Sequence, residues 1–248
     1  MATLRRTADQ RGRTYWWKDR QYPSVTSIIS GGLPKPELAK WAAQRVAAYA
    51  SEHLDELRER RAAGPIADEL ASVPWAERDA AADLGSEIHA HAEARLLGQT
   101  LPPPSILAAQ YIAGLDAWIA RKRPLWAAAE ATVVNTSLGY AGTLDAIVEL
   151  DGELTILDYK TGKSVWPDAA LQLAAYAHAE WLILPSDKAV PMPVVTRAGV
   201  LHLQPLQAHW IEADIGPTTW QAFLAVWEVW RWRTEWAAQA LGEEEATP

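Results

Sequence analysis

The dipeptide Asp151-Gly152 stands between two runs of alternating apolar residues, and no other feature restricts the fold of this chain as strongly. A two-residue hairpin loop needs positive φ at both positions, which Asp and Gly tolerate, so the pattern predicts a β-hairpin. With these residues as the loop, Leu150 faces Glu153 and the numbers of opposed residues sum to 303. The same register places Asp145 opposite Asp158 and Thr143 opposite Lys160.

This register brings two carboxylates and a lysine together. Side chains alternate along a strand, so Asp158 and Lys160 share one face, with Asp145 across from them. Directly opposed like charges destabilise a sheet, and a divalent cation such as Mg²⁺ removes that repulsion. A lysine beside the metal suits a phosphate oxygen or an attacking water. The pattern therefore favours metal-assisted hydrolysis of a phosphate ester, with a structural Asp–Lys pair as the alternative. A slip of one residue would move Asp158 to the other face.

Hydrophobic spacing and turn residues predict the remaining elements. We expect a loosely ordered basic start with a short strand near residues 15–17, and an ordered segment from Pro23. The expected helices cover residues 36–53, 54–72 (broken at Gly64-Pro65), 74–97, 106–123, 167–184 and 220–241. The expected strands cover residues 131–137, 143–150 and 154–160, with one or two more within 194–204.

The order of these elements indicates a mixed α/β chain, which we interpret as a single domain because no clear linker is present. Its expected parts are a basic N-terminal arm (1–21), a mainly helical part (22–125), a catalytic core (126–210) and a C-terminal helix (217–242). Five of the 14 tryptophans lie on that last helix, at positions 220, 227, 230, 232 and 236. At helical spacing such residues are typical of a core or a partner surface, although aromatic faces also stack on bases.

Composition excludes several classes of protein. The 248 residues include no cysteine, which excludes disulfides, a thiolate nucleophile and a cysteine-ligated iron–sulfur cluster. The formal net charge of −8 argues against non-specific coating of nucleic acid, although residues 5–20 and 121–123 are locally basic. Neither a secretory signal nor a membrane-spanning run is evident, so we expect a cytoplasmic protein with no membrane partner.

Three segments resemble motifs of the PD-(D/E)XK nuclease superfamily, in its RecB-like and Cas4-like branch. They are Gly142-Thr143-Leu144-Asp145, then Leu157-Asp158-Tyr159-Lys160-Thr161-Gly162, then Gln172-Leu173-Ala174-Ala175-Tyr176. Upstream, Gly85-Ser86-Glu87-Ile88-His89 is similar to a helix of this branch that supplies a histidine ligand. The segment from Pro23 to Ile28 is similar to the opening of phage exonucleases. Because the chain has no cysteine, it is most similar to the phage exonucleases that lack an iron–sulfur cluster.

The resemblance implies a fold and a set of roles. The fold is a restriction-endonuclease-like α/β core: a mixed central sheet, with a strand hairpin carrying the active site, flanked by helices. An N-terminal helical region and the C-terminal Trp-rich helix add to it. The implied catalytic residues are Asp145, Asp158, Lys160, Gln172 and Tyr176. The implied ligands of Mg²⁺ or Mn²⁺ are His89, Asp145, Asp158 and the Tyr159 carbonyl, with Glu130 and Glu93 in support.

Contacts to DNA are expected from Lys163 and from Arg121, Lys122 and Arg123. Simpler interpretations stay open beside these roles. His89 could be an ordinary interior histidine, Glu93 could face solvent, and Lys163 could be merely exposed.

The resemblance implies a Mg²⁺- or Mn²⁺-dependent deoxyribonuclease, with an exonuclease favoured over an endonuclease. It would serve recombination, replication or repair in a phage or bacterium, in the host cytoplasm if phage-encoded. DNA is the expected partner. A homo-oligomer and a single-strand annealing protein are further partners that phage precedent suggests. The alternatives are a catalytically silent DNA-end-binding protein that keeps the fold, and an assembly protein that uses the Trp-rich helix.

Overall fold

The predicted hairpin lies at the centre of the molecule. The computed structural model describes residues 4–9, 12–59 and 63–242. Strands β5 (Tyr140–Leu150) and β6 (Glu153–Lys160) are joined by Asp151 and Gly152, with φ values of +54° and +86°. Their ladder runs from the Leu150–Glu153 pair to the Ala146–Leu157 pair, which confirms the predicted register over that length.

Five more strands extend the hairpin into a seven-stranded sheet of order β10-β9-β6-β5-β4-β7-β8. They are β4 (Leu125–Asn135), β7 (Trp181–Ile183), β8 (Ala189–Pro191), β9 (Arg197–Gln204) and β10 (Gln207–Ala213). Strand β9 runs parallel to β6, whereas the other neighbours are antiparallel. The predicted mixed sheet and the meander of β4, β5 and β6 are thereby confirmed.

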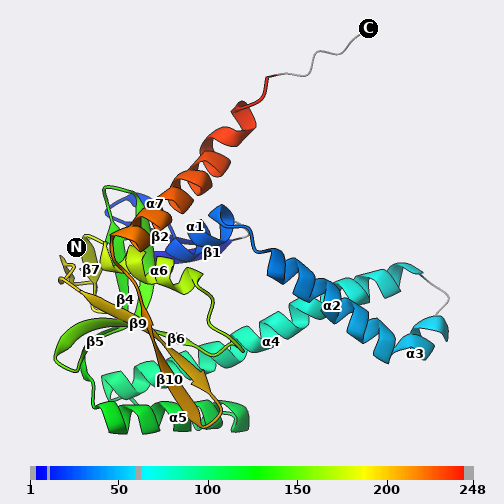
Figure 1. Cartoon of the computed structure of the whole chain (residues 1–248), viewed down its shortest axis with the longest axis horizontal. Coiled ribbons are helices and arrows are strands. Elements are labelled where there is room, and N and C mark those ends of the chain that lie inside the picture. Colours follow the sequence, from blue (N-terminus) through cyan, green and yellow to red (C-terminus); the bar gives the residue numbers. More distant parts are fainter. Residues whose placement is uncertain (1–3, 10–11, 60–62, 243–248) are drawn as a thin grey trace.

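Helices cover both faces of this sheet (Figure 1). Helix α5 (Ile106–Lys122) and the C-terminal part of α4 (Ala63–Leu97) pack on one face, around a core that contains Ile88, Leu115 and Trp118. Helices α1 (Val25–Gly32), α6 (Asp168–Ala177) and α7 (Pro217–Arg231) share a second core on the other face. The mixed α/β architecture agrees with a restriction-endonuclease-like fold.

The N-terminal half of α4 leaves the sheet and forms an arm with α2 (Pro36–Glu52) and α3 (Leu54–Glu59) (Figure 1). We expected a break at Gly64-Pro65 and a helix start at Pro74, and both expectations were wrong. Gly64-Pro65 lies in the first turn of α4, where proline is tolerated, and Pro74 lies within the helix. Side chains of α2 hold α4 on both sides of Pro74, since Tyr49 donates to Glu69 and Arg45 to Glu77.

The basic start is an ordered sheet rather than the loosely ordered arm we expected. Strands β1 (Arg5–Asp9), β2 (Gly12–Trp17) and β3 (Arg20–Pro23) form an antiparallel sheet. The expected strand at residues 15–17 belongs to β2. Tyr15, Trp17 and Tyr22 are buried against β4 and β5, which anchors the small sheet beside the large one.

Two further expectations were wrong in extent, and one strand was missed. Helix α6 ends at Ala177 rather than Leu184, because Trp181–Ile183 pairs with β4 as strand β7. Strand β10 was not expected, and it forms a hairpin with β9. The C-terminal α-helix ends at Arg231 and continues as a π-helical turn (Trp232–Trp236) and a short 3₁₀ turn (Ala237–Gln239), instead of running on to residue 241.

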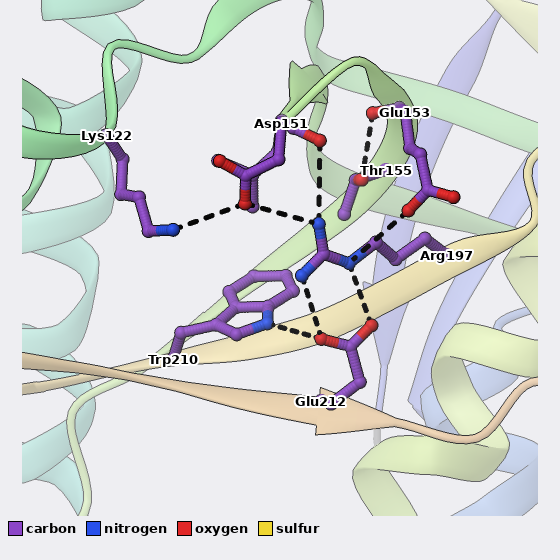
Figure 2. Close-up of polar contacts among 8 residues, drawn as sticks. Lys122, Asp151, Glu153, Thr155, Arg197, Trp210 and Glu212 are labelled. Atoms are coloured by element: carbon purple, nitrogen blue, oxygen red, sulfur yellow. Dashed lines mark hydrogen bonds and ion pairs between the residues drawn. The ribbon is translucent and has the colours of Figure 1, made fainter.

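A cluster of charged side chains surrounds the turn between β5 and β6 (Figure 2). The Arg197 guanidinium on β9 donates to both carboxylate oxygens of Glu212 on β10, at 2.8 and 3.1 Å. It also lies 3.6 Å from the carboxylate of Asp151 and 3.9 Å from that of Glu153. Arg197 therefore ties the β5–β6 turn to β9 and β10.

Within the described residues, no helix is both long and apolar enough to cross a lipid bilayer.

Candidate active site

The candidate site lies where β5 and β6 separate. Beyond Ala146–Leu157 the two strands no longer pair, and β6 continues beside β9, with Asp158 opposite Val200 and Lys160 opposite His202. Asp145 occupies the fork, where its Oδ2 accepts a hydrogen bond from the Tyr159 amide at 2.7 Å. The Asp145 carboxylate thus takes the place of a backbone carbonyl of β5 as the partner of the Tyr159 amide. As a result, the expected Asp145–Asp158 and Thr143–Lys160 pairs lie past the end of the β5–β6 ladder.

Asp158 and Lys160 lie on one face of β6, as predicted. Asp158 is 3% exposed, and its Oδ2 lies 2.6 Å from the Lys160 ammonium. Its other oxygen accepts a hydrogen bond from the Gln172 side-chain amide at 2.9 Å, and Gln172 also contacts the Tyr176 hydroxyl at 3.2 Å. Helix α6 therefore brings Gln172 and Tyr176 against Asp158, because positions four apart share a helix face.

A second group of side chains meets at Asp145. The Nδ1 of His89, on α4, lies 3.4 Å from the Asp145 Oδ1. Glu130, on β4, completes a set of three whose ligand atoms all lie within 4.8 Å of one another. Glu130 has a φ of +47°, an uncommon conformation for a residue other than glycine. That conformation is not visible in the sequence, where Glu130 was expected only to support the site.

These residues line one cleft of about 530 Å³. Its acidic members are Glu93, Glu130, Asp145 and Asp158, and its basic members are Arg6, Arg13 and Lys160. Arg6 and Arg13 come from β1 and β2, and the Arg6 guanidinium donates to the Thr143 hydroxyl at 3.3 Å. The sequence marked both arginines only as part of a basic stretch, because nothing local indicates that the small sheet folds over the cleft.

Burial and mutual repulsion perturb the acids of the cleft. Burial, with the nearby Asp145, raises the pKa of Glu130 to about 7 and that of Asp158 to about 6. Burial also acts on Asp145, but His89 and Lys160 outweigh it and lower the pKa of that carboxyl. Burial opposes the positive charge of Lys160, yet Asp158 and Asp145 raise its pKa, so Lys160 stays a cation near neutral pH.

The residues expected to contact DNA do not line the cleft. Arg121, Lys122 and Arg123 end α5 beside the hairpin turn, where Lys122 pairs with Asp151 at 3.2 Å, so they lie at the opposite end of the hairpin from the cleft. Lys163 is exposed in the loop after β6. Glu93 lines the cleft near Glu130, whose pKa it helps to raise, while His89 has Asp145 as its carboxylate neighbour.

The donor set fits a hard divalent cation. Two carboxylates and one imidazole converge in a water-accessible cleft, and oxygen-rich sites of this kind suit Mg²⁺ or Mn²⁺. Burial raises the pKa of Glu130 most, and the neighbouring carboxylates of Asp145 and Glu93 add to the rise; a bound cation would offset that repulsion. The converging group contains His89, Glu130 and Asp145. Asp158, also expected among the ligands, lies beside this group, and its oxygens contact Lys160 and Gln172.

A protein-family model described as the PD-(D/E)XK nuclease superfamily matches residues 5–204, which include every residue that lines the cleft. No curated protein matches the chain.

Proposed function

We propose that this chain, which belongs to the PD-(D/E)XK nuclease superfamily, is a Mg²⁺- or Mn²⁺-dependent deoxyribonuclease that acts from DNA ends. The observation that carries the proposal is the junction of two groups at the β5–β6 fork. His89, Glu130 and Asp145 form a ligand set, and Asp158 and Lys160 form a buried ion pair beside it.

Each group has its own task in hydrolysis. A bound cation lowers the pKa of its water and offsets charge on the phosphate. His89, Glu130 and Asp145 would hold that cation. Lys160, a cation held by Asp158, would bind a phosphate oxygen rather than remove a proton. Gln172 fixes Asp158, which keeps the Lys160 ammonium in place. The bond that forms would join the water oxygen to phosphorus, and the bond that breaks would join phosphorus to the sugar oxygen of the leaving strand end. The proton lost by the water would pass to solvent, and the leaving oxygen would take up a proton from solvent.

Substrate binding would depend on the basic wall of the cleft. Arg6 and Arg13 face the acidic centre from the small sheet and supply charge for the flanking phosphates. A protein with net charge −8 binds DNA at such local sites, so cleavage should weaken as salt rises. We place the chain with the members of the superfamily that lack an iron–sulfur cluster, because it has no cysteine to ligate one.

The test uses linear and covalently closed circular double-stranded DNA with Mg²⁺, Mn²⁺ or EDTA. We expect metal-dependent loss of the linear form alone, abolished in Lys160→Ala and retained in Lys188→Ala, a control at an exposed loop lysine. Cleavage of both forms would make the protein an endonuclease. DNA binding without cleavage by the wild type, or full activity in Lys160→Ala, would refute the proposed reaction.

A further inference from the structure

A smaller hollow adjoins the cleft at Lys160. It encloses about 240 Å³ and shares Thr26, Lys160 and Gln172 with the main cleft, so the two hollows are neighbours. Pockets for drug-sized molecules are about 300–1,000 Å³, so this space suits a single planar group. Its position beside Lys160 places any occupant next to the reacting phosphate.

The walls of the hollow combine apolar side chains with two lysines and one aspartate. Ile29 and Ala169 are buried, and Val165 is half-buried. Lys35 stands at the rim, where its ammonium pairs with Asp168 at 2.7 Å. Together with Lys160 it gives the hollow two ammonium groups, which suits an apolar ring attached to a phosphate.

Trp166 completes the wall with a large exposed aromatic surface. It is 55% exposed, although tryptophan is usually well buried. Its backbone is held at the start of α6, since its carbonyl accepts a hydrogen bond from the Ala169 amide at 3.1 Å and Pro167 follows it. The indole is thus exposed on a fixed backbone at the edge of the hollow.

We propose that this hollow takes the base of the nucleotide next to the scissile phosphate, stacked on Trp166. The inference rests on the proposed nuclease function and narrows its substrate. A base inside a duplex is stacked on its neighbours, so only an unpaired nucleotide can enter the hollow. The protein therefore cuts single-stranded DNA or frayed ends, and stacking makes it tolerant of sequence because every base has a π-face.

The first step of the test maps the bond that the wild-type protein cuts in a single-stranded oligonucleotide. Two further oligonucleotides then carry an abasic nucleotide immediately 5′ or immediately 3′ of that bond. We compare wild type with Trp166→Ala, with Trp166→Phe, which keeps an aromatic ring, and with Trp75→Ala. Trp75 is a matched control, because it is 57% exposed and lies on the arm outside both hollows.

Loss of a base–aromatic stack should lower kcat/KM by about tenfold. For the wild type, an abasic nucleotide on one side should cause that loss. On the intact oligonucleotide, kcat/KM of Trp166→Ala should be lower than that of the wild type by the same factor. Trp166→Ala should then cut the intact and the abasic oligonucleotide with equal kcat/KM. Trp166→Phe and Trp75→Ala should still cut the intact oligonucleotide faster than the abasic one. A general folding defect would slow all substrates alike and leave their ratio unchanged, so this cycle isolates the stack.

The outcomes separate the two proposals. Suppose that the wild type cuts DNA, and that Trp166→Ala distinguishes intact from abasic oligonucleotides as strongly as the wild type does. This result would refute the base pocket and leave the nuclease function intact. Equal rates on abasic and intact oligonucleotides in the wild type do the same. No metal-dependent cleavage of any substrate by the wild type refutes the nuclease function and, with it, this inference.

Discussion

Raising the pH of the metal-free protein should destabilise it, because of the acids in the cleft. A carboxyl whose pKa is higher in the folded than in the unfolded state binds its proton more tightly when folded. Its contribution to stability is therefore lost as pH rises from the unfolded pKa through the folded pKa. For Asp158 this window runs from 3.8 to about 6, and for Glu130 from 4.5 to about 7.

The other titrating groups of the site do not reverse this trend. The pKa of His89 is raised, because Asp145 outweighs the effect of burial, so its contribution is present below 6.5 and is also lost as pH rises. The pKa of Asp145 is lowered, and its contribution is lost only in acid, below 3.8. Between pH 5 and 8, the titrations of Asp158, Glu130 and His89 therefore all lower the stability of the folded protein as the pH rises.

The magnitude follows from the shift of the buried carboxyl. About two pKa units on Asp158 correspond to about 3 kcal/mol in total, of which about half falls between pH 5 and 8. Glu130 is half-buried and screened by solvent, so it adds a smaller share. We expect a combined loss of about 2 kcal/mol, which for a chain of this length lowers Tm by about 4–8 °C.

Thermal unfolding in EDTA, at constant ionic strength from pH 5 to 8, measures this effect. Asp158→Asn and Glu130→Gln should each flatten the profile, and Asp187→Asn, at an exposed loop position, should not. Mg²⁺ or Mn²⁺ should raise Tm more at pH 8 than at pH 5, because protons compete for the ligands. A Tm that is constant or rises with pH in the wild type, or an unchanged slope in both acid variants, would refute the reasoning.

Two further substitutions test the scaffold of the site. Gly142→Ala would place a Cβ 2.4 Å from the ring of buried Tyr176. We therefore expect the free energy of unfolding, measured in urea, to fall by about 1–3 kcal/mol, and cleavage to be reduced. Gly64→Ala, whose new Cβ would lie in open space, is the control, and equal stability of the two variants would contradict this packing. Arg197→Ala leaves the carboxylates of Asp151, Glu153 and Glu212 without their shared cation, so we expect a loss of about 1–2 kcal/mol by the same measurement. Arg197→Lys should restore only part of it because it lacks the planar fork, and a neutral Arg197→Ala would show that the cluster does not stabilise the hairpin.

The sequence determined the hairpin and its immediate consequences. Turn chemistry is local, so Asp151-Gly152 alone defined the register from Leu150–Glu153 to Ala146–Leu157 and placed Asp158 and Lys160 on one face. Helices α2 and α5 were predicted closely for the same reason: each has local start and stop signals, such as Pro36 at the start of α2 and Pro124 after α5. Helical spacing likewise placed Gln172 and Tyr176 on one side of α6.

Only the tertiary structure decided what surrounds that hairpin. At the fork beside Asp145, β6 stays paired with β9 after its pairing with β5 has ended, and parallel pairing between distant segments has no local signal. Arg6 and Arg13 reach the cleft through a small sheet that packs on β4 and β5, and Glu130 joins the ligand set through a positive φ. The residue types of the site could thus be predicted from the sequence, but their convergence depended on contacts between distant segments, such as His89 with Asp145 and Arg6 with Thr143.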